Sequence, residues 1–161
     1  MKIGIIRRID NLGRIVIPKE IRNILRIKNG DSLEINTEGE TVTLKKYSEL
    51  NNLIEIENVI ASLLKETLKK DILITDKDKY IVGTKKEYIN KIITNELLEI
   101  LENRQMIIRK EKNNYILINP IIINGDVVGS IIIISKEEIN ENQIKTVTLL
   151  TNFLIKSSDR T

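Results

Sequence analysis

Positive charge is concentrated at one end of this chain of 161 residues, and this division constrains the architecture more than any other feature. The first 28 residues hold eight Lys and Arg side chains against two carboxylates, a net charge of +6. From residue 51 onwards, sixteen Lys and Arg balance sixteen Asp and Glu. The length suits one domain or two small ones, and the break in charge favours two. We therefore expect a basic head, residues 1–48, and a neutral body, residues 49–161.

The head combines short strand patterns with one helical pattern. Strands are predicted by alternating or β-branched side chains, and turns by Gly and Asn. Pro18 suits the first turn of a helix, where its missing N–H costs nothing. In chain order we expect a strand at 3–10, a turn at 11–13, a strand at 15–17, a helix at 18–26, and strands at 32–37 and 41–47 joined by a turn at 38–40.

A unit of this size has difficulty folding alone. About fifty residues bury only a modest share of their surface, and the chain has no Cys for a disulfide staple. Pairing of two heads, with strands exchanged between the chains, is the physical remedy. We therefore predict a homodimer through residues 1–48.

One face of the predicted helix is cationic and the opposite face is aliphatic. At 100° per residue, Lys19, Arg22 and Arg26 project within one sector, and Ile21 and Leu25 project away from it. Arginine presents a rigid fork of donors that suits phosphate oxygens and base edges. The predicted polyanion-binding residues are Arg7, Arg8, Arg14, Lys19, Arg22, Asn23 and Arg26. The competing interpretation is a solvated face, which one-signed charge on strand, turn and helix together disfavours.

The run from Gly4 to Arg22 (GIIRRIDNLGRIVIPKEIR), with LKKY at 44–47, resembles the DNA-binding domain of AbrB-type transition-state regulators. The resemblance implies a swapped-hairpin β-barrel of two chains that binds double-stranded DNA, in a bacterial transcription regulator. It assigns DNA contact to Arg7, Arg14 and Arg22. Asn23 stands where the family often has a second helix arginine, so we expect altered sequence preference or weaker binding. Asp10 could orient a neighbouring arginine or cap the turn.

The body alternates amphipathic helices with apolar strands, which makes the whole chain α+β. Its order of elements resembles a GAF-like or PAS-like sensor domain, and AbrB-type heads joined to such a domain imply a sporulation-related, nucleoid-associated cytoplasmic regulator. Relative to that pattern the connection at 103–114 is short, and we leave open whether the body binds a small-molecule ligand. The expected elements are helices at 49–70, 85–102 and 137–156 and strands at 71–76, 79–83, 106–109, 115–123 and 127–135.

The two terminal helices of the body carry apolar stripes. These stripes either cover only their own sheet or also pair across a two-fold axis in a four-helix bundle. Since the head is expected to dimerise, a second interface would make a homotetramer with two DNA-binding ends.

The composition argues against catalytic activity and against a metal site. The chain has neither His nor Cys, the usual general base, nucleophile and metal ligands, so we expect no catalytic residue, metal or cofactor and no enzyme activity. Asp76 and Asp78 fit a hairpin turn better than a calcium loop. No apolar run is long enough to span a membrane. The alternative function is that of an antitoxin, in which an AbrB-type head binds DNA and an appended segment binds a toxin protein.

Overall fold

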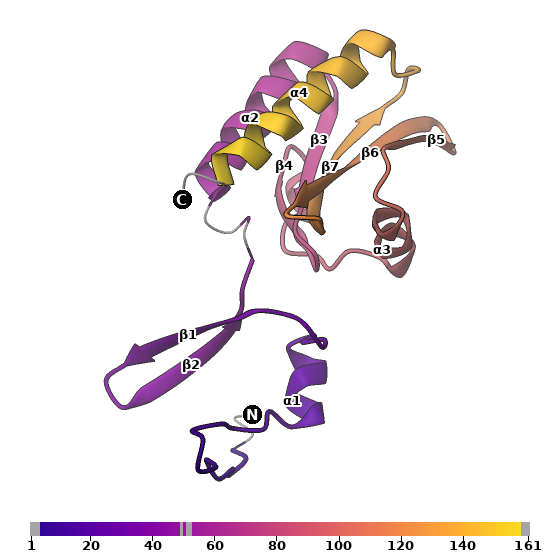
Figure 1. Cartoon of the computed structure of the whole chain (residues 1–161). Coiled ribbons are helices and arrows are strands. Elements are labelled where there is room, and N and C mark those ends of the chain that lie inside the picture. Colours follow the sequence, from indigo (N-terminus) through magenta and orange to yellow (C-terminus); the bar gives the residue numbers. More distant parts are fainter. Residues whose placement is uncertain (1–3, 49, 51–52, 159–161) are drawn as a thin grey trace. The chain divides into compact units, whose positions relative to one another are not determined.

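The computed structural model describes residues 4–48, 50 and 53–158. The chain divides between Tyr47 and Ser48 into two compact units (Figure 1). The fold class is α+β, as predicted: the head contains one short helix and a hairpin, and the body contains a sheet with helices on both faces.

The hairpin of the head forms where the sequence predicted it. Strand β1 (Leu33–Glu38) pairs antiparallel with β2 (Thr41–Lys46), and Gly39 adopts a φ of 57° in the turn. Cross-strand partners share a face of a sheet. Because Ile35 lies opposite Leu44, one face of the hairpin is aliphatic, and it comprises Leu33, Ile35, Val42 and Leu44.

Helix α1 (Lys19–Ile24) is shorter than the predicted helix over 18–26. The amide of Ile27 donates to the carbonyl of Arg22 at 2.8 Å, and the amide of Arg26 donates to the carbonyl of Asn23 at 3.2 Å. With Arg26 at a φ of 54°, this pattern is a Schellman ending in which arginine takes the left-handed position usually given to glycine. The helix therefore ends before Asn29 and Gly30, the residues expected to stop it.

The strands predicted at 3–10 and 15–17 are not present within the single chain: residues 4–17 form no ladder, and residues 1–3 lie outside the described residues. A strand exists only when its backbone groups pair with a neighbour. Among the described residues of one head, the backbone pairing of these segments is limited to the turn, where the amide of Asp10 donates to the carbonyl of Arg14 at 3.1 Å. The turn between them does form. The exchanged-strand barrel stays a prediction, because it concerns two chains.

The body is built on a five-stranded antiparallel sheet in the order β4-β3-β7-β6-β5. Each predicted strand of the body is present, with ends moved by one or two residues. The long pair β6–β7 turns at Asn124 and Gly125, which adopt φ values of 51° and 85°, the sign that a two-residue hairpin turn requires. The strands are β3 (Asp71–Thr75), β4 (Tyr80–Gly83), β5 (Ile107–Glu111), β6 (Asn114–Ile123) and β7 (Asp126–Ser135).

Helices cover both faces of this sheet. Helices α2 (Ile54–Leu68) and α4 (Glu141–Ser158) lie side by side over one face, and α3 (Asn95–Glu102) lies against the other (Figure 1). Val147 and Leu154, on the predicted apolar stripe of α4, are fully buried in the core beneath α2 and α4. Helix α2 begins at residue 54 instead of 49, and residues 49, 51 and 52 lie outside the described residues. Helix α4 begins at residue 141 instead of 137, after the cap at Asn140.

The single helix predicted over 85–102 is wrong. A 3-10 turn, η2 (Lys86–Tyr88), is followed by an extended segment before α3 begins. The amide of Asn90 donates to the carbonyl of Tyr80 at 2.8 Å, and the amide of Ile93 donates to that of Asp78 at 2.9 Å. This segment therefore lies alongside β4, and Thr94 starts a separate helix by accepting from the amide of Leu97.

Candidate nucleic-acid interface

The turn at residues 10–14 fixes the position of one predicted DNA-contacting arginine. Oδ1 of Asp10 accepts from the amides of Leu12 and Arg14 at 2.9 and 2.8 Å, and Oδ2 accepts from Nε of Arg14 at 2.7 Å. These bonds from Arg14 and Leu12 lower the pKa of Asp10 below its usual range. Asp10 thus both caps the turn and orients the arginine, the two roles that the sequence left open. The other nitrogens of the guanidinium are left to meet a ligand.

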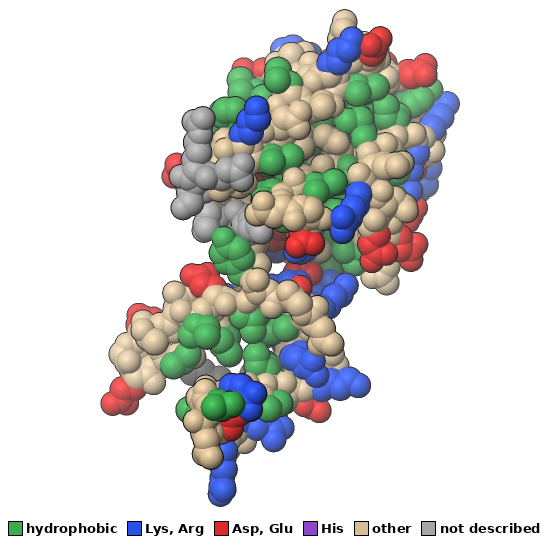
Figure 2. Space-filling model, viewed as in Figure 1, with side chains coloured by type: hydrophobic (Ala, Val, Ile, Leu, Met, Phe, Trp, Pro, Cys, Tyr) green, Lys and Arg blue, Asp and Glu red, His purple; other side chains and the backbone are tan. Residues whose placement is uncertain are grey.

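The remaining predicted cations have no acidic partner. Among the described residues of the head, none of Arg7, Arg8, Lys19, Arg22 and Arg26 forms an ion pair. In Figure 2, Lys and Arg side chains gather over α1 and the N-terminal segment, and acidic side chains gather over the β1–β2 hairpin. This separation leaves one end of the head with an excess of positive charge.

Helix α1 brings part of the predicted set together. Lys19, Arg22 and Asn23 are three and four residues apart within it, so they share one face. Arg22 is half-buried, and its Nε is buried without a hydrogen-bond partner. Arg26 lies beyond the helix end, so helical periodicity does not place its side chain on that face; its carbonyl accepts from Nζ of Lys46 at 3.3 Å.

The head has no core of its own. None of its residues 4–48 is buried, although the same segment carries many aliphatic side chains. Ile6 is 94% exposed and Val16 is 76% exposed, and both belong to the predicted strands that find no partner in the single chain. An exposed apolar surface of this kind marks an interface. The large hydrophobic side chains exposed in the head are Ile5, Ile6, Ile9, Leu12, Ile15, Val16, Ile24, Leu25, Ile35, Val42, Leu44 and Tyr47.

A buried carboxyl in the body was missed by the sequence reasoning. Glu57 of α2 is fully buried, and neither of its oxygens has a hydrogen-bond partner. Burial, with the charge of Asp76 as a smaller cause, raises the pKa of Glu57 to about 8. Its burial could have been predicted from the sequence, because Glu57 lies at helical spacing from Leu53, Ile60 and Leu64 on the buried stripe.

The described residues contain neither a metal-binding cluster nor a helix that could span a membrane. Across residues 4–48, 50 and 53–158, no cluster of three or more His, Cys, Asp or Glu is arranged to hold a metal ion. In the same part of the chain, every helix is too short or too polar to cross a membrane. Asp76 accepts from the amides of Asp78 and Lys79 at 2.7 Å, which is the hairpin turn expected there.

Two family descriptions together cover most of the chain. Residues 6–50 match the family "Antidote-toxin recognition MazE, bacterial antitoxin", and residues 52–158 match "Stage V sporulation protein T C-terminal, transcription factor". Stage V sporulation protein T of Bacillus subtilis (strain 168) is 37% identical over 175 residues, 98% of this chain and 98% of that protein. Transition state regulatory protein AbrB of the same organism is 52% identical over 44 residues, 27% of this chain and 46% of its own.

Solved GAF-domain structures match the body. A GAF domain/HD domain protein from Geobacter sulfurreducens has a TM-score of 0.56 at 12% identity and covers 66% of this chain and 92% of its own. The cofactor binding GAF domain of the nutrient sensor CodY from Clostridium difficile has a TM-score of 0.52 at 11% identity, and the match covers 62% of this chain and 82% of that domain's chain. At these identities the likeness establishes a GAF-type fold and nothing about ligands.

An AbrB-type head followed by a GAF-type body defines a transcription regulator of sporulation or the transition state. The chain belongs to the stage V sporulation protein T family.

Proposed function

We propose that the chain binds double-stranded DNA as a homodimer of its heads and acts in the cytoplasm, at the nucleoid, as a regulator and not as an enzyme. The observation that carries this proposal is the combination of unpaired cations and exposed aliphatic side chains in a head without a core. The contact residues we propose are those predicted from the sequence, namely Arg7, Arg8, Arg14, Lys19, Arg22, Asn23 and Arg26.

A second copy is the partner that best fits the uncovered aliphatic surface of the head. Residues 4–17 have the sequence of strands but lack a neighbour, and the hairpin has one aliphatic face that includes Ile35, which is 66% exposed. Pairing two heads with exchanged strands would satisfy the backbone groups and cover the aliphatic face in one step. It would also double the number of cations that face one ligand.

The charge distribution supports a phosphate backbone as that ligand. Arg14 is held by Asp10 at the tip of a turn, and Lys19, Arg22 and Asn23 share a face of α1. Contacts to phosphates fix register, and an amide such as that of Asn23 can also read a base edge. Relaxed specificity with recognition of DNA shape fits this small set of side chains.

Binding to duplex DNA at moderate salt, measured with the full chain, tests the proposal. We expect the change Arg14→Ala to weaken binding, and the change Lys77→Gln, in an exposed turn of the body, to leave it unaltered. Genome-wide footprinting would then identify the bound sequences. Equal affinity of the wild-type and Arg14→Ala proteins would remove Arg14 from the interface.

For the body we propose signal sensing and pairing of α2 and α4 across a two-fold axis, which would make a tetramer. The support is an apolar surface on the outer side of these helices. Val59 and Leu63 of α2 are 57% and 45% exposed, and Leu149 and Phe153 of α4 are 69% and 56% exposed. Residues four apart on a helix form one stripe, so each helix contributes a stripe that the sheet does not cover.

An antitoxin function is the second candidate, and the match of residues 6–50 to an antitoxin family favours it. The body argues against it, because residues 53–158 form a folded sheet and helices instead of a short tail that folds on a toxin. A stable complex with the product of a neighbouring toxin gene, formed through residues 49–161, would support this candidate over the first.

A further inference from the structure

The body has a cleft at the end of the sheet opposite the hairpin turn of β6 and β7. It is open to solvent and has a volume of about 770 Å³, which is enough for a small ligand. Helix α2 supplies one wall with Ser62, Lys65 and Glu66, and Lys69 continues it just past the helix end. The other wall comes from the start of β3 and from the end of β7 with the loop that follows. These residues lie side by side because Asp71 pairs with Ile134 in the sheet.

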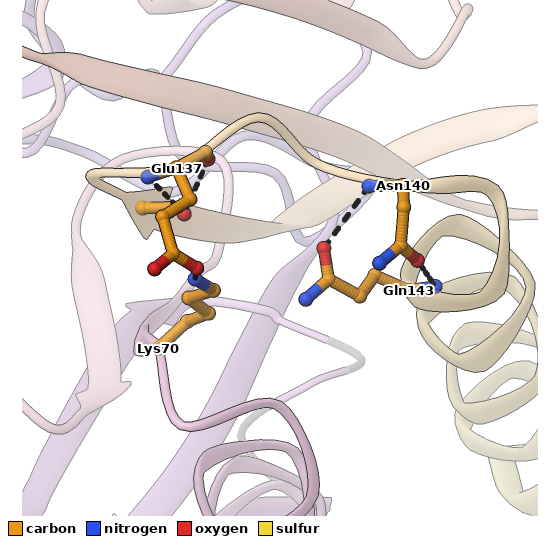
Figure 3. A network of polar contacts seen from close by, with 5 residues as sticks. Lys70, Glu137, Asn140 and Gln143 are labelled. Carbon is orange, nitrogen blue, oxygen red and sulfur yellow. Dashed lines mark hydrogen bonds and ion pairs between the residues drawn. The ribbon is translucent and has the colours of Figure 1, made fainter.

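Ion pairs and hydrogen bonds hold the rim of the cleft in place. Nζ of Lys70 donates to Oε2 of Glu137 at 2.8 Å, and this pair joins the end of α2 to the loop after β7 (Figure 3). Oγ of Ser135 donates to the carbonyl of Glu137 at 2.6 Å and accepts from its amide at 3.0 Å. Asn140 and Gln143 exchange two hydrogen bonds at the start of α4 (Figure 3). A rim fixed in this way does not have to be ordered by a ligand.

The charges of the cleft do not balance. Glu137 is neutralised by Lys70, and Asp71 pairs with Lys85 at 3.3 Å. Lys65, Lys69 and Lys136 remain exposed, and none of them has an ion pair among the described residues. Glu66 is the one lining carboxylate that these pairs do not neutralise. The ten lining residues therefore carry a net charge of +1, which becomes +2 when Lys85, the partner of Asp71 outside the lining, is included.

The lining also limits the chemistry of the ligand. Ile134 is the one aliphatic residue among the ten lining residues, and the other nine are Lys, Ser, Asp or Glu, so charged and hydroxyl groups predominate at the ends of the lining side chains. On the other face of the sheet, beneath α3, aliphatic side chains fill the space: Leu73, Ile93, Leu97, Leu101, Ile118 and Ile132 are at most 5% exposed. A compact anion suits the cleft better than the space beneath α3.

We propose that this cleft binds a small phosphate-bearing anion, held between Lys65 of α2, Lys69 just past the end of that helix, and Lys136 of the loop before α4. Such a ligand would tie the C-terminal end of α2 to the loop that leads from β7 into α4. These are the two helices whose outer stripes we assign to the second interface. The link to regulation rests on the proposed function, whereas the binding itself does not.

Isothermal titration of the full chain with inorganic pyrophosphate at low ionic strength tests the site. We expect the double change Lys65→Gln and Lys136→Gln to weaken binding roughly tenfold or more, since it removes two charged donors. Lys77→Gln, in the exposed turn after β3, and Arg14→Ala, in the head, should each bind pyrophosphate as the wild type does. A nucleoside diphosphate that binds more tightly than pyrophosphate would assign the phosphates to a nucleotide, and equal affinity would assign them to free pyrophosphate.

Three results would overturn the site: no binding by the wild-type chain, an equal loss in Lys77→Gln, or a loss confined to Arg14→Ala. The DNA measurement separates this inference from the proposed function. If pyrophosphate binds at the cleft and DNA affinity does not change, the site stands and its link to regulation is refuted. If the chain does not bind DNA at all, the proposed function fails and the site still stands.

Discussion

Neutralising the buried carboxyl of α2 by the change Glu57→Gln should remove a large pH dependence of stability. In the folded chain the pKa of Glu57 is about 8, against an ordinary value of 4.5. Because folding raises this pKa, the fold favours the neutral acid. The contribution of Glu57 to the free energy of unfolding is therefore fully present below about pH 4.5 and is lost as the pH rises through about 8.

The size of the effect follows from the difference in pKa. Each unit corresponds to about 1.4 kcal/mol, so the wild-type chain should lose roughly 3 kcal/mol of unfolding free energy between pH 4.5 and pH 7 from this group. The amide of glutamine has nearly the same shape and does not titrate. The Glu57→Gln protein should therefore show less than about 1 kcal/mol of this loss.

Urea unfolding of the full chain at a series of pH values measures this difference directly. Glu55→Gln is the matched control, because Glu55 lies in the first turn of the same helix and is exposed. Its stability should follow the wild-type pH profile. A wild-type free energy that stays flat between pH 5 and pH 8, or equal slopes for the wild type and Glu57→Gln, would refute the reasoning.

Three other changes give separate tests. Arg14→Ala should reduce the slope of log K against log salt by about 1.8 if two copies of the arginine each neutralise one phosphate, and an unchanged slope in DNA-binding titrations would contradict this. Gly129→Ala should lower the thermal midpoint, because an added Cβ would lie 2.0 Å from the carbonyl oxygen of Thr75; an unshifted midpoint would show that the strands can separate there at no cost. Phe153→Asp should reduce the light-scattering mass from four chains to two, and a persistent tetramer would exclude α4 from the second interface.

Structure set by neighbouring residues was predictable from the sequence. The turn at Asn124 and Gly125 and the turn capped by Asp76 each depend on two or three residues, and both are where they were expected. The start of α4 was equally local, since Asn140 and Gln143 form a reciprocal cap, but the apolar pattern before it drew the predicted boundary too early.

Structure set by distant residues was not predictable in this way. The segment around Asn90 has helical periodicity, yet hydrogen bonds to Tyr80 and Asp78 draw it alongside β4. The Schellman ending at Arg26 is local, but it was missed because a charged residue takes the left-handed position that glycine usually occupies. In the candidate interface, the pairing of Asp10 with Arg14 was one of two alternatives that the sequence allowed. In the body, the burial of Glu57 was missed because its position on the apolar stripe of the helix was not considered together with its charge.

The missing core of the head also has a kinetic consequence. If two heads pair as proposed, each obtains its interior from the other copy and folds in a step whose rate depends on the square of chain concentration. Scarce chains would remain inactive, and modest overproduction would raise the amount of competent dimer more than proportionally. A cell could then set the threshold of the regulator through its rate of synthesis.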